Sequence, residues 1–90
     1  MKVKFFATYR DITRRKDEDF PAPSDVWELV QNLVGRYNGF QTELLTPDKT
    51  EINEETIILV NGRDICHLDG KNTALSEADV VSVFPMVAGG

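Results

Sequence analysis

The stretch SDVWELVQNLVGRYNG, residues 24–39, decides the fold, because it carries the clearest helix signal in the chain. Asp25 and Glu28, three residues apart, resemble a capping box, with Ser24 as an alternative cap. Asn38-Gly39 supplies a stop signal. The stretch predicts one long helix with a single apolar face, which needs another layer to cover it. The residues of this face recur at helical spacing: Val26, Leu29, Val30, Leu33, Val34 and Tyr37.

Strand patterns precede the helix. Residues 2–9 alternate in polarity, and Phe6 is an aromatic exception on the otherwise polar, outer face. Residues 10–15 are expected to hold a helical turn or a loop. The charged residues 16–20 predict a short strand at the edge of a sheet, ended by Pro21.

Strand patterns also follow the helix. Residues 56–60 are apolar on both faces, which predicts a buried, central strand. Asn61-Gly62 accepts the positive φ angles of a type I′ turn and predicts a hairpin into residues 63–68. Residues 80–84 form the last predicted strand. Between these elements, residues 40–55 are expected to be irregular, with one short helical turn.

The order strand, strand, helix, loop, strand, short strand, last strand predicts an α+β domain of two layers. We expect a ubiquitin-like β-grasp, in which one long helix packs across a mixed sheet of four to five strands. A split ferredoxin-like arrangement is the alternative, but it normally has a second long helix, which the sequence lacks. The sheet face toward the helix is expected to contain Val3, Phe5, Ile57, Leu59, Val81 and Val83.

Length and charge narrow the class further. Ninety residues predict a single domain, 1–90, with a flexible C-terminal tail at 86–90. A formal net charge of −5 argues against a nucleic-acid partner and against an anionic membrane surface. No stretch approaches the roughly 20 apolar residues of a membrane span. Cys66 is the single cysteine, which fits a reducing compartment, so a cytoplasmic protein is expected.

Three local motifs contain residue types that can bind metal ions or phosphate. Cys66-His67 lacks the further cysteine or histidine that a metal site needs, so no metal ligand is assigned. The acidic run Asp17-Glu18-Asp19 is interpreted as a solvated edge strand rather than a cation site. Arg14-Arg15-Lys16 is interpreted as solvated rather than as a phosphate site.

The sequence closes with Gly89-Gly90, shortly after the strand that ends in Phe84-Pro85. Glycines without side chains can enter a tunnel too narrow for other residues. A free carboxylate is a poor acyl donor until it is activated, for example by adenylation. The ending therefore suits a protein whose own C-terminus reacts, although a frayed end without function is the alternative.

Four segments resemble the MoaD-type small subunit of molybdopterin synthase, within the MoaD/ThiS sulfur carriers. The resemblance covers nearly the whole chain, and its C-terminal motif is the specific part. Met86 departs from the pattern, which usually has a second proline there. The segments are Phe5-Phe6-Ala7, Val60-Asn61-Gly62, Leu75 to Val80, and Phe84 to Gly90.

The resemblance implies a ubiquitin-like fold and a reaction cycle at the C-terminus. An E1-like enzyme would use ATP to adenylate the Gly90 carboxylate. Gly89, which also lacks a side chain, would let the tail enter a narrow active site. A cysteine desulfurase or rhodanese-like sulfur donor would then leave a thiocarboxylate. The large subunit of molybdopterin synthase would pass this sulfur to the pterin. The chain itself would be a non-catalytic subunit that binds no cofactor stably.

Other functions remain open at this point. The chain is alternatively a ubiquitin-like modifier joined to lysines through Gly90, or a sulfur carrier for thiamine or transfer-RNA thiolation. A plain interaction domain with an incidental Gly-Gly ending is a further alternative.

A partner surface is expected on the outer face of the sheet. Phe6 and Phe84 share that face in the predicted pattern, and exposed contiguous apolar groups commonly mark partner surfaces. Ile65, Pro85 and Met86 are expected to extend the surface. The alternative is that these side chains merely pack beneath loops.

Overall fold

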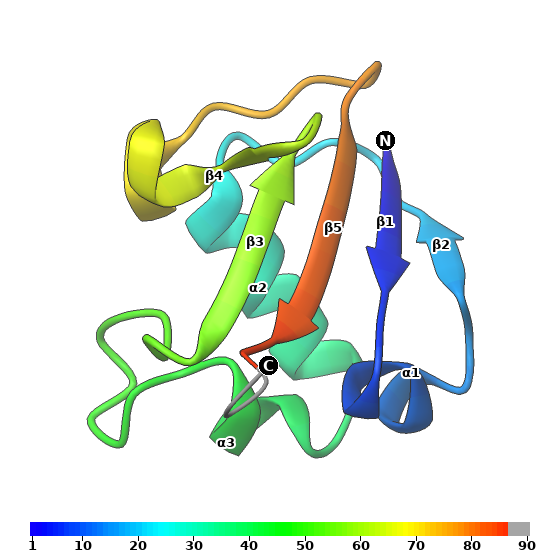
Figure 1. Cartoon of the computed structure of the whole chain (residues 1–90), viewed down its shortest axis with the longest axis vertical. Helices are drawn as coiled ribbons and strands as arrows, with labels where there is room; N and C mark the ends of the chain where they lie inside the picture. Colours follow the sequence, from blue (N-terminus) through cyan, green and yellow to red (C-terminus); the bar gives the residue numbers. More distant parts are fainter. Residues whose placement is uncertain (87–90) are drawn as a thin grey trace.

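Five strands form one mixed sheet in the order β2-β1-β5-β3-β4 (Figure 1). The computed structural model describes residues 1–86. The first and last strands of the chain, β1 and β5, run parallel at the centre of the sheet, and β3 pairs antiparallel with β5 on its other side. The strands are β1 (Lys2–Phe5), β2 (Asp17–Asp19), β3 (Thr56–Val60), β4 (Arg63–Asp64) and β5 (Val80–Pro85).

The long helix α2 crosses one face of this sheet (Figure 1). The Asp25 carboxylate caps it by accepting a hydrogen bond from the Glu28 N–H at 2.9 Å, as predicted. Its buried residues, Val26, Leu29, Val30 and Leu33, all belong to the predicted apolar face, whereas Val34 and Tyr37 are only partly buried. The α+β class and the sheet-plus-helix layout are confirmed. The helical segments are α1 (Thr8–Thr13), α2 (Val26–Arg36), α3 (Phe40–Glu43) and the 3₁₀ turns η1 (Ile65–His67) and η2 (Gly70–Asn72).

The face of β3 toward α2 differs from the prediction. Ile58 is 1% exposed and Val60 is 6% exposed, while Ile57 and Leu59 lie on the outer face and are only partly buried. All but the first residue of this strand are aliphatic, so alternation in the sequence could not fix its phase. Pairing with β5 fixes it instead, because Ile58 lies opposite the buried Val83.

The hairpin after β3 turns as predicted but ends early. Asn61 and Gly62 adopt φ values of 53° and 84°, the positive angles expected of this turn. β4 then has two residues, because the Asp64 carboxylate accepts the Cys66 N–H at 2.9 Å and starts η1. Ile65 is thereby turned into the core, where it is 7% exposed.

Glu18 in the edge strand β2 is buried, although the sequence suggested a solvated acidic run. Its neighbours Asp17 and Asp19 are exposed as expected. The Glu18 carboxylate accepts a hydrogen bond from the Tyr37 hydroxyl and pairs with the Arg36 guanidinium. Both partners come from the end of α2, so this buried charge ties the edge strand to the helix.

The revised phase of β3 predicts unequal effects of two identical substitutions. Ile58→Ala should lower the free energy of unfolding by about 2–5 kcal/mol, because it opens a cavity in the core. Ile57→Ala should lower it by about 1 kcal/mol or less, because that side chain is only partly buried on the outer face. Urea denaturation of both variants measures the difference. A larger loss from Ile57→Ala would show that the strand is placed in the wrong register.

Candidate functional site

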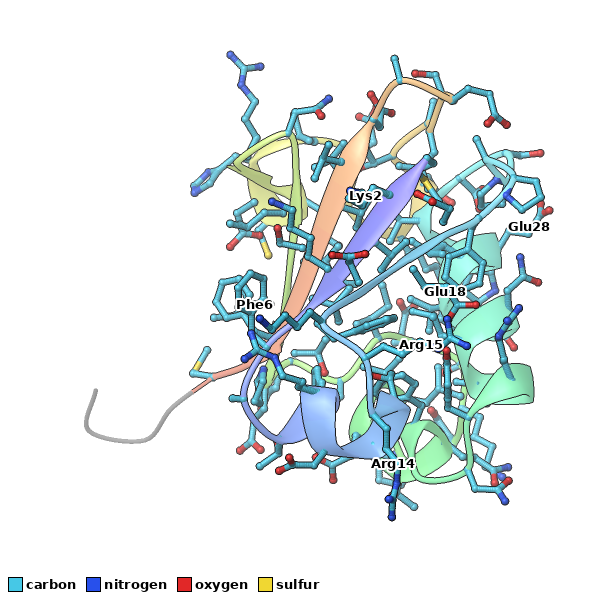
Figure 2. All side chains as sticks on the ribbon, turned by 90° about the vertical axis from the view of Figure 1, so that its right-hand side faces the viewer. Lys2, Phe6, Arg14, Arg15, Glu18 and Glu28 are labelled. Atoms are coloured by element: carbon cyan, nitrogen blue, oxygen red, sulfur yellow. The ribbon has the colours of Figure 1, made fainter. Side chains whose placement is uncertain are left out.

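Two aromatic rings meet on the outer face of the sheet. Phe6 follows β1 and Phe84 lies in β5, and their ring centroids are 5.9 Å apart in an edge-to-face contact. Phe6 is 38% exposed, which is unusual for a large apolar side chain (Figure 2). The rings line a shallow, almost wholly apolar hollow of about 400 Å³, which we call the outer-face patch. Its residues are Phe6, Ala7, Leu59, Ser82, Phe84 and Pro85.

The backbone around Phe6 explains why this ring stays at the surface. Phe6 continues the parallel pairing of β1, since its N–H donates to the Val83 carbonyl at 3.2 Å. Ala7 then adopts φ 54° and ψ −133°, a region that normally requires glycine, and turns the chain into α1. The Arg10 guanidinium lies 5.8 Å from the Phe6 ring centroid. Phe6 is therefore packed between Phe84 and Arg10 rather than folded inward.

The chain leaves the sheet beside the outer-face patch. Pro85 lines the patch, and the N–H of the next residue, Met86, donates to the Glu55 carbonyl at 2.7 Å. The Met86 side chain is 56% exposed. Gly89 and Gly90, and with them most of the predicted tail at 86–90, lie outside the described residues. The end of the described residues thus lies adjacent to the patch.

The predicted partner surface is assembled in part. Phe6, Phe84 and Pro85 come together, and Met86 is exposed at the end of the same strand. Ile65 does not contribute, because the early turn into η1 buries it in the core, and that prediction is wrong. The extended face instead includes Leu59, which sequence reasoning assigned to the inner face.

The position of Leu59 on the outer face follows from the pairing of β3 with β5. Once Phe84 is placed on the outer face, its cross-strand partner Ile57 must lie on the same face. Leu59, two residues further along β3, follows by alternation. The pairing of β3 with β5 was predictable in outline, but its register was not.

The chemically reactive side chains lie elsewhere. Cys66 is exposed in η1, and the hydrogen bond and negative charge of Asp64 raise the pKa of its thiol. His67 follows it in the same 3₁₀ turn. The two residues were expected to be neighbours in a strand, and that prediction is wrong. Within residues 1–86, no three His, Cys, Asp or Glu side chains are placed to hold a metal ion. No helix in that part of the chain is long and apolar enough to cross a membrane.

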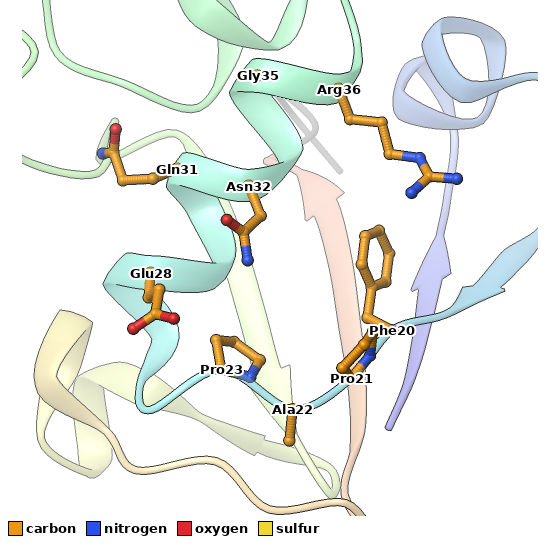
Figure 3. A pocket seen from close by; sticks show the side chains of 9 residues that line it. All are labelled: Phe20, Pro21, Ala22, Pro23, Glu28, Gln31, Asn32, Gly35 and Arg36. Carbon is orange, nitrogen blue, oxygen red and sulfur yellow. The ribbon is translucent and has the colours of Figure 1, made fainter.

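A second hollow, of about 580 Å³, lies between α2 and the segment from Phe20 to Pro23 (Figure 3). Gln31, Asn32 and the ion-paired Arg36 are among the residues that line it. It contains no nucleophile and no strongly apolar floor, so the outer-face patch remains the stronger candidate for a partner site.

The sequence matches the ThiS family over residues 3–90. It is 37% identical to small archaeal modifier protein 3 of Haloferax volcanii over 92 residues, covering 100% of this chain and 98% of that protein. It is 25% identical to the molybdopterin synthase sulfur carrier subunit of Emericella nidulans, covering 99% of this chain and 96% of that protein.

Among solved structures, small archaeal modifier protein 1 from Methanosarcina acetivorans superimposes with a TM-score of 0.85 at 28% identity. The superposition covers 99% of this chain and 94% of that one. The order of the five strands, the single long helix and the nearly full-length family match agree with the resemblance seen in the sequence. The chain belongs to the ThiS family of ubiquitin-like sulfur carriers and modifiers, and its fold is the ubiquitin-like β-grasp.

Proposed function

We propose that this chain is a sulfur carrier whose Gly90 carboxylate is adenylated and then converted into a thiocarboxylate. The observation that carries the proposal is the position of the outer-face patch at the point where the chain leaves the sheet. Only four residues follow Met86, and four residues reach at most about 14 Å. A partner that covers Phe6 and Phe84 can therefore hold the terminal carboxylate in its own active site.

The chemistry divides between the carrier and its partners. An E1-like enzyme attaches AMP from ATP to the Gly90 carboxylate, and pyrophosphate leaves. The persulfide of a cysteine desulfurase or rhodanese-like donor attacks this acyl carbon, and AMP leaves. Reduction of the resulting acyl disulfide by a thiol frees the thiocarboxylate. The carrier supplies the carboxylate and the docking surface, binds no cofactor of its own, and works in the cytoplasm, where thiols are kept reduced.

The molybdopterin pathway is the destination we favour. Phe84-Pro85 before the tail resembles the molybdopterin synthase small subunit, and a relative of that name matches along almost the whole chain. The receiver would then be the large subunit of molybdopterin synthase, with the outer-face patch seated on it.

Conjugation to proteins is the second candidate. A small archaeal modifier protein matches this chain over its full length at 37% identity, which favours this function as a real alternative. Both functions begin with the same acyl-adenylate. They differ only in the nucleophile that attacks it: a persulfide sulfur for a carrier, or a lysine amine for a modifier.

Intact-mass measurement tests the carrier function. The chain incubated with ATP, an E1-like enzyme and a sulfur donor should gain the mass of one sulfur in place of one oxygen. The Cys66→Ser variant should gain the same mass, because the only thiol of the chain is not the acceptor. Deletion of Gly90 should abolish the gain and leave the melting temperature unchanged.

The outcome that contradicts the carrier function is equally distinct. Covalent products of higher mass that survive denaturing, reducing gels, with no sulfur incorporation, would assign the chain to the modifiers. Absence of any ATP-dependent product with a competent E1-like enzyme would exclude both functions.

The docking role of the outer-face patch gives a second prediction. Phe84→Lys should weaken binding to the E1-like enzyme by about tenfold or more, because a charge replaces a central aromatic contact. The matched control is Gln31→Lys, which adds the same charge on the exposed face of α2. Isothermal titration calorimetry of both variants measures the difference. Equal affinities for the two variants would remove the patch from the interface.

A further inference from the structure

Four of the ten lysine and arginine residues of the chain lie within seven positions, although the net charge is −5. They surround a hollow of about 430 Å³ at the end of α1, together with Asp11. We call this the basic surface; Figure 2 shows two of its residues, Arg14 and Arg15, on the side of the molecule where β2 and α1 lie. Its residues are Arg10, Arg14, Arg15 and Lys16.

These cations have no carboxylate partner among the described residues. The ion pairs within residues 1–86 join Met1 to Glu77, Arg36 to Glu18, and Lys71 to Glu51. Arg10 is occupied by the Phe6 ring instead, and Asp11 is the only acidic residue that lines the hollow. The remaining basic side chains repel one another, and an anion from outside would relieve that repulsion.

The backbone conformation of Arg14 is also unusual for an arginine. Arg14 ends α1 with φ 59°, the left-handed conformation that glycine usually provides at this position. Its N–H donates to the Arg10 carbonyl at 2.7 Å, as that kind of helix end requires. A cation therefore occupies a position where glycine is usual, and Arg14→Gly removes its charge without straining the backbone.

The basic surface is continuous with the outer-face patch. Arg10 belongs to the first and contacts Phe6 of the second at 5.8 Å from the ring centroid. A partner that covers Phe6 and extends past Arg10 meets the other three cations directly.

We propose that the basic surface binds an acidic segment of the E1-like enzyme, which covers the outer-face patch when it adenylates the C-terminal tail. This inference rests on the proposed function. Guanidinium groups match carboxylates with two parallel hydrogen bonds, and three arginines lie here. The rest of the chain is acidic and would repel the long phosphate backbone of a nucleic acid, so carboxylates of a protein suit the site better. Charges of this kind mainly accelerate association.

The test compares two variants that each lose two cations. The first is Arg14→Gly with Arg15→Gln, which leaves Arg10 and the outer-face patch intact. The control is Lys49→Gln with Arg63→Gln, two exposed positions outside the basic surface. Stopped-flow association with the E1-like enzyme should slow about tenfold at low salt for the first variant, and less than twofold for the control. The difference should shrink as salt is raised.

Three further readouts separate this inference from its alternatives. The first variant should still be fully thiocarboxylated at saturating concentration, with an unchanged or higher melting temperature, because Gly90 is intact and glycine suits the φ angle at position 14. A poly-glutamate peptide should shift the amide resonances of residues 10–16 in the wild type and not in the first variant. This peptide titration does not depend on the proposed function.

Two results would overturn the inference. Equal association rates for the two variants at low salt would show that the basic surface is not used. Tighter binding of a single-stranded RNA oligonucleotide than of the acidic peptide, lost in the first variant, would assign the surface to nucleic acid.

Discussion

The parallel pairing of β1 with β5 is the constraint on which the rest of the structure depends. It places Val3 and Phe5 beside Val81 and Val83 on the inner face, where α2 covers them. The same alternation sends Phe84 to the outer face and brings it against Phe6. One pairing therefore builds the core and brings the two rings of the outer-face patch together.

Most of the fold follows from local signals that agree with one another. The capping residue Asp25, the apolar face of α2 and the turn at Asn61-Gly62 each specify one conformation, and the structure has them as expected. The failures have a common cause: the signal was not local. The phase of β3 depends on its partner strand, and the burial of Glu18 depends on Arg36 and Tyr37, distant in sequence.

In the candidate site, too, the residues with a local sequence signal were predicted correctly and the others were not. Phe6 was recognisable because an aromatic side chain interrupted the polar face of a strand, and Phe84 because it lies on the matching face of β5. Leu59 was misplaced because the aliphatic β3 does not reveal its own phase. Ile65 was misplaced because a two-residue β4 could not be foreseen from an apolar pattern. Asp64 decided that point by capping η1, and a cap of this kind competes with strand pairing wherever an Asp follows a tight turn.

The short helix α1 connects the outer-face patch to the basic surface, and contacts with the rest of the fold hold it in place. A six-residue helix is not stable alone, and both residues that flank it, Ala7 and Arg14, adopt positive φ angles without being glycine. The buried Tyr9 anchors it, through its ring packed on Phe40 and its hydroxyl 2.9 Å from the Thr56 hydroxyl. This anchor offsets the backbone strain. Phe6 precedes this helix, Arg10 lies in it and Arg14 ends it, so the anchor at Tyr9 sets the backbone positions of all three, which limits the backbone entropy lost when a partner covers them.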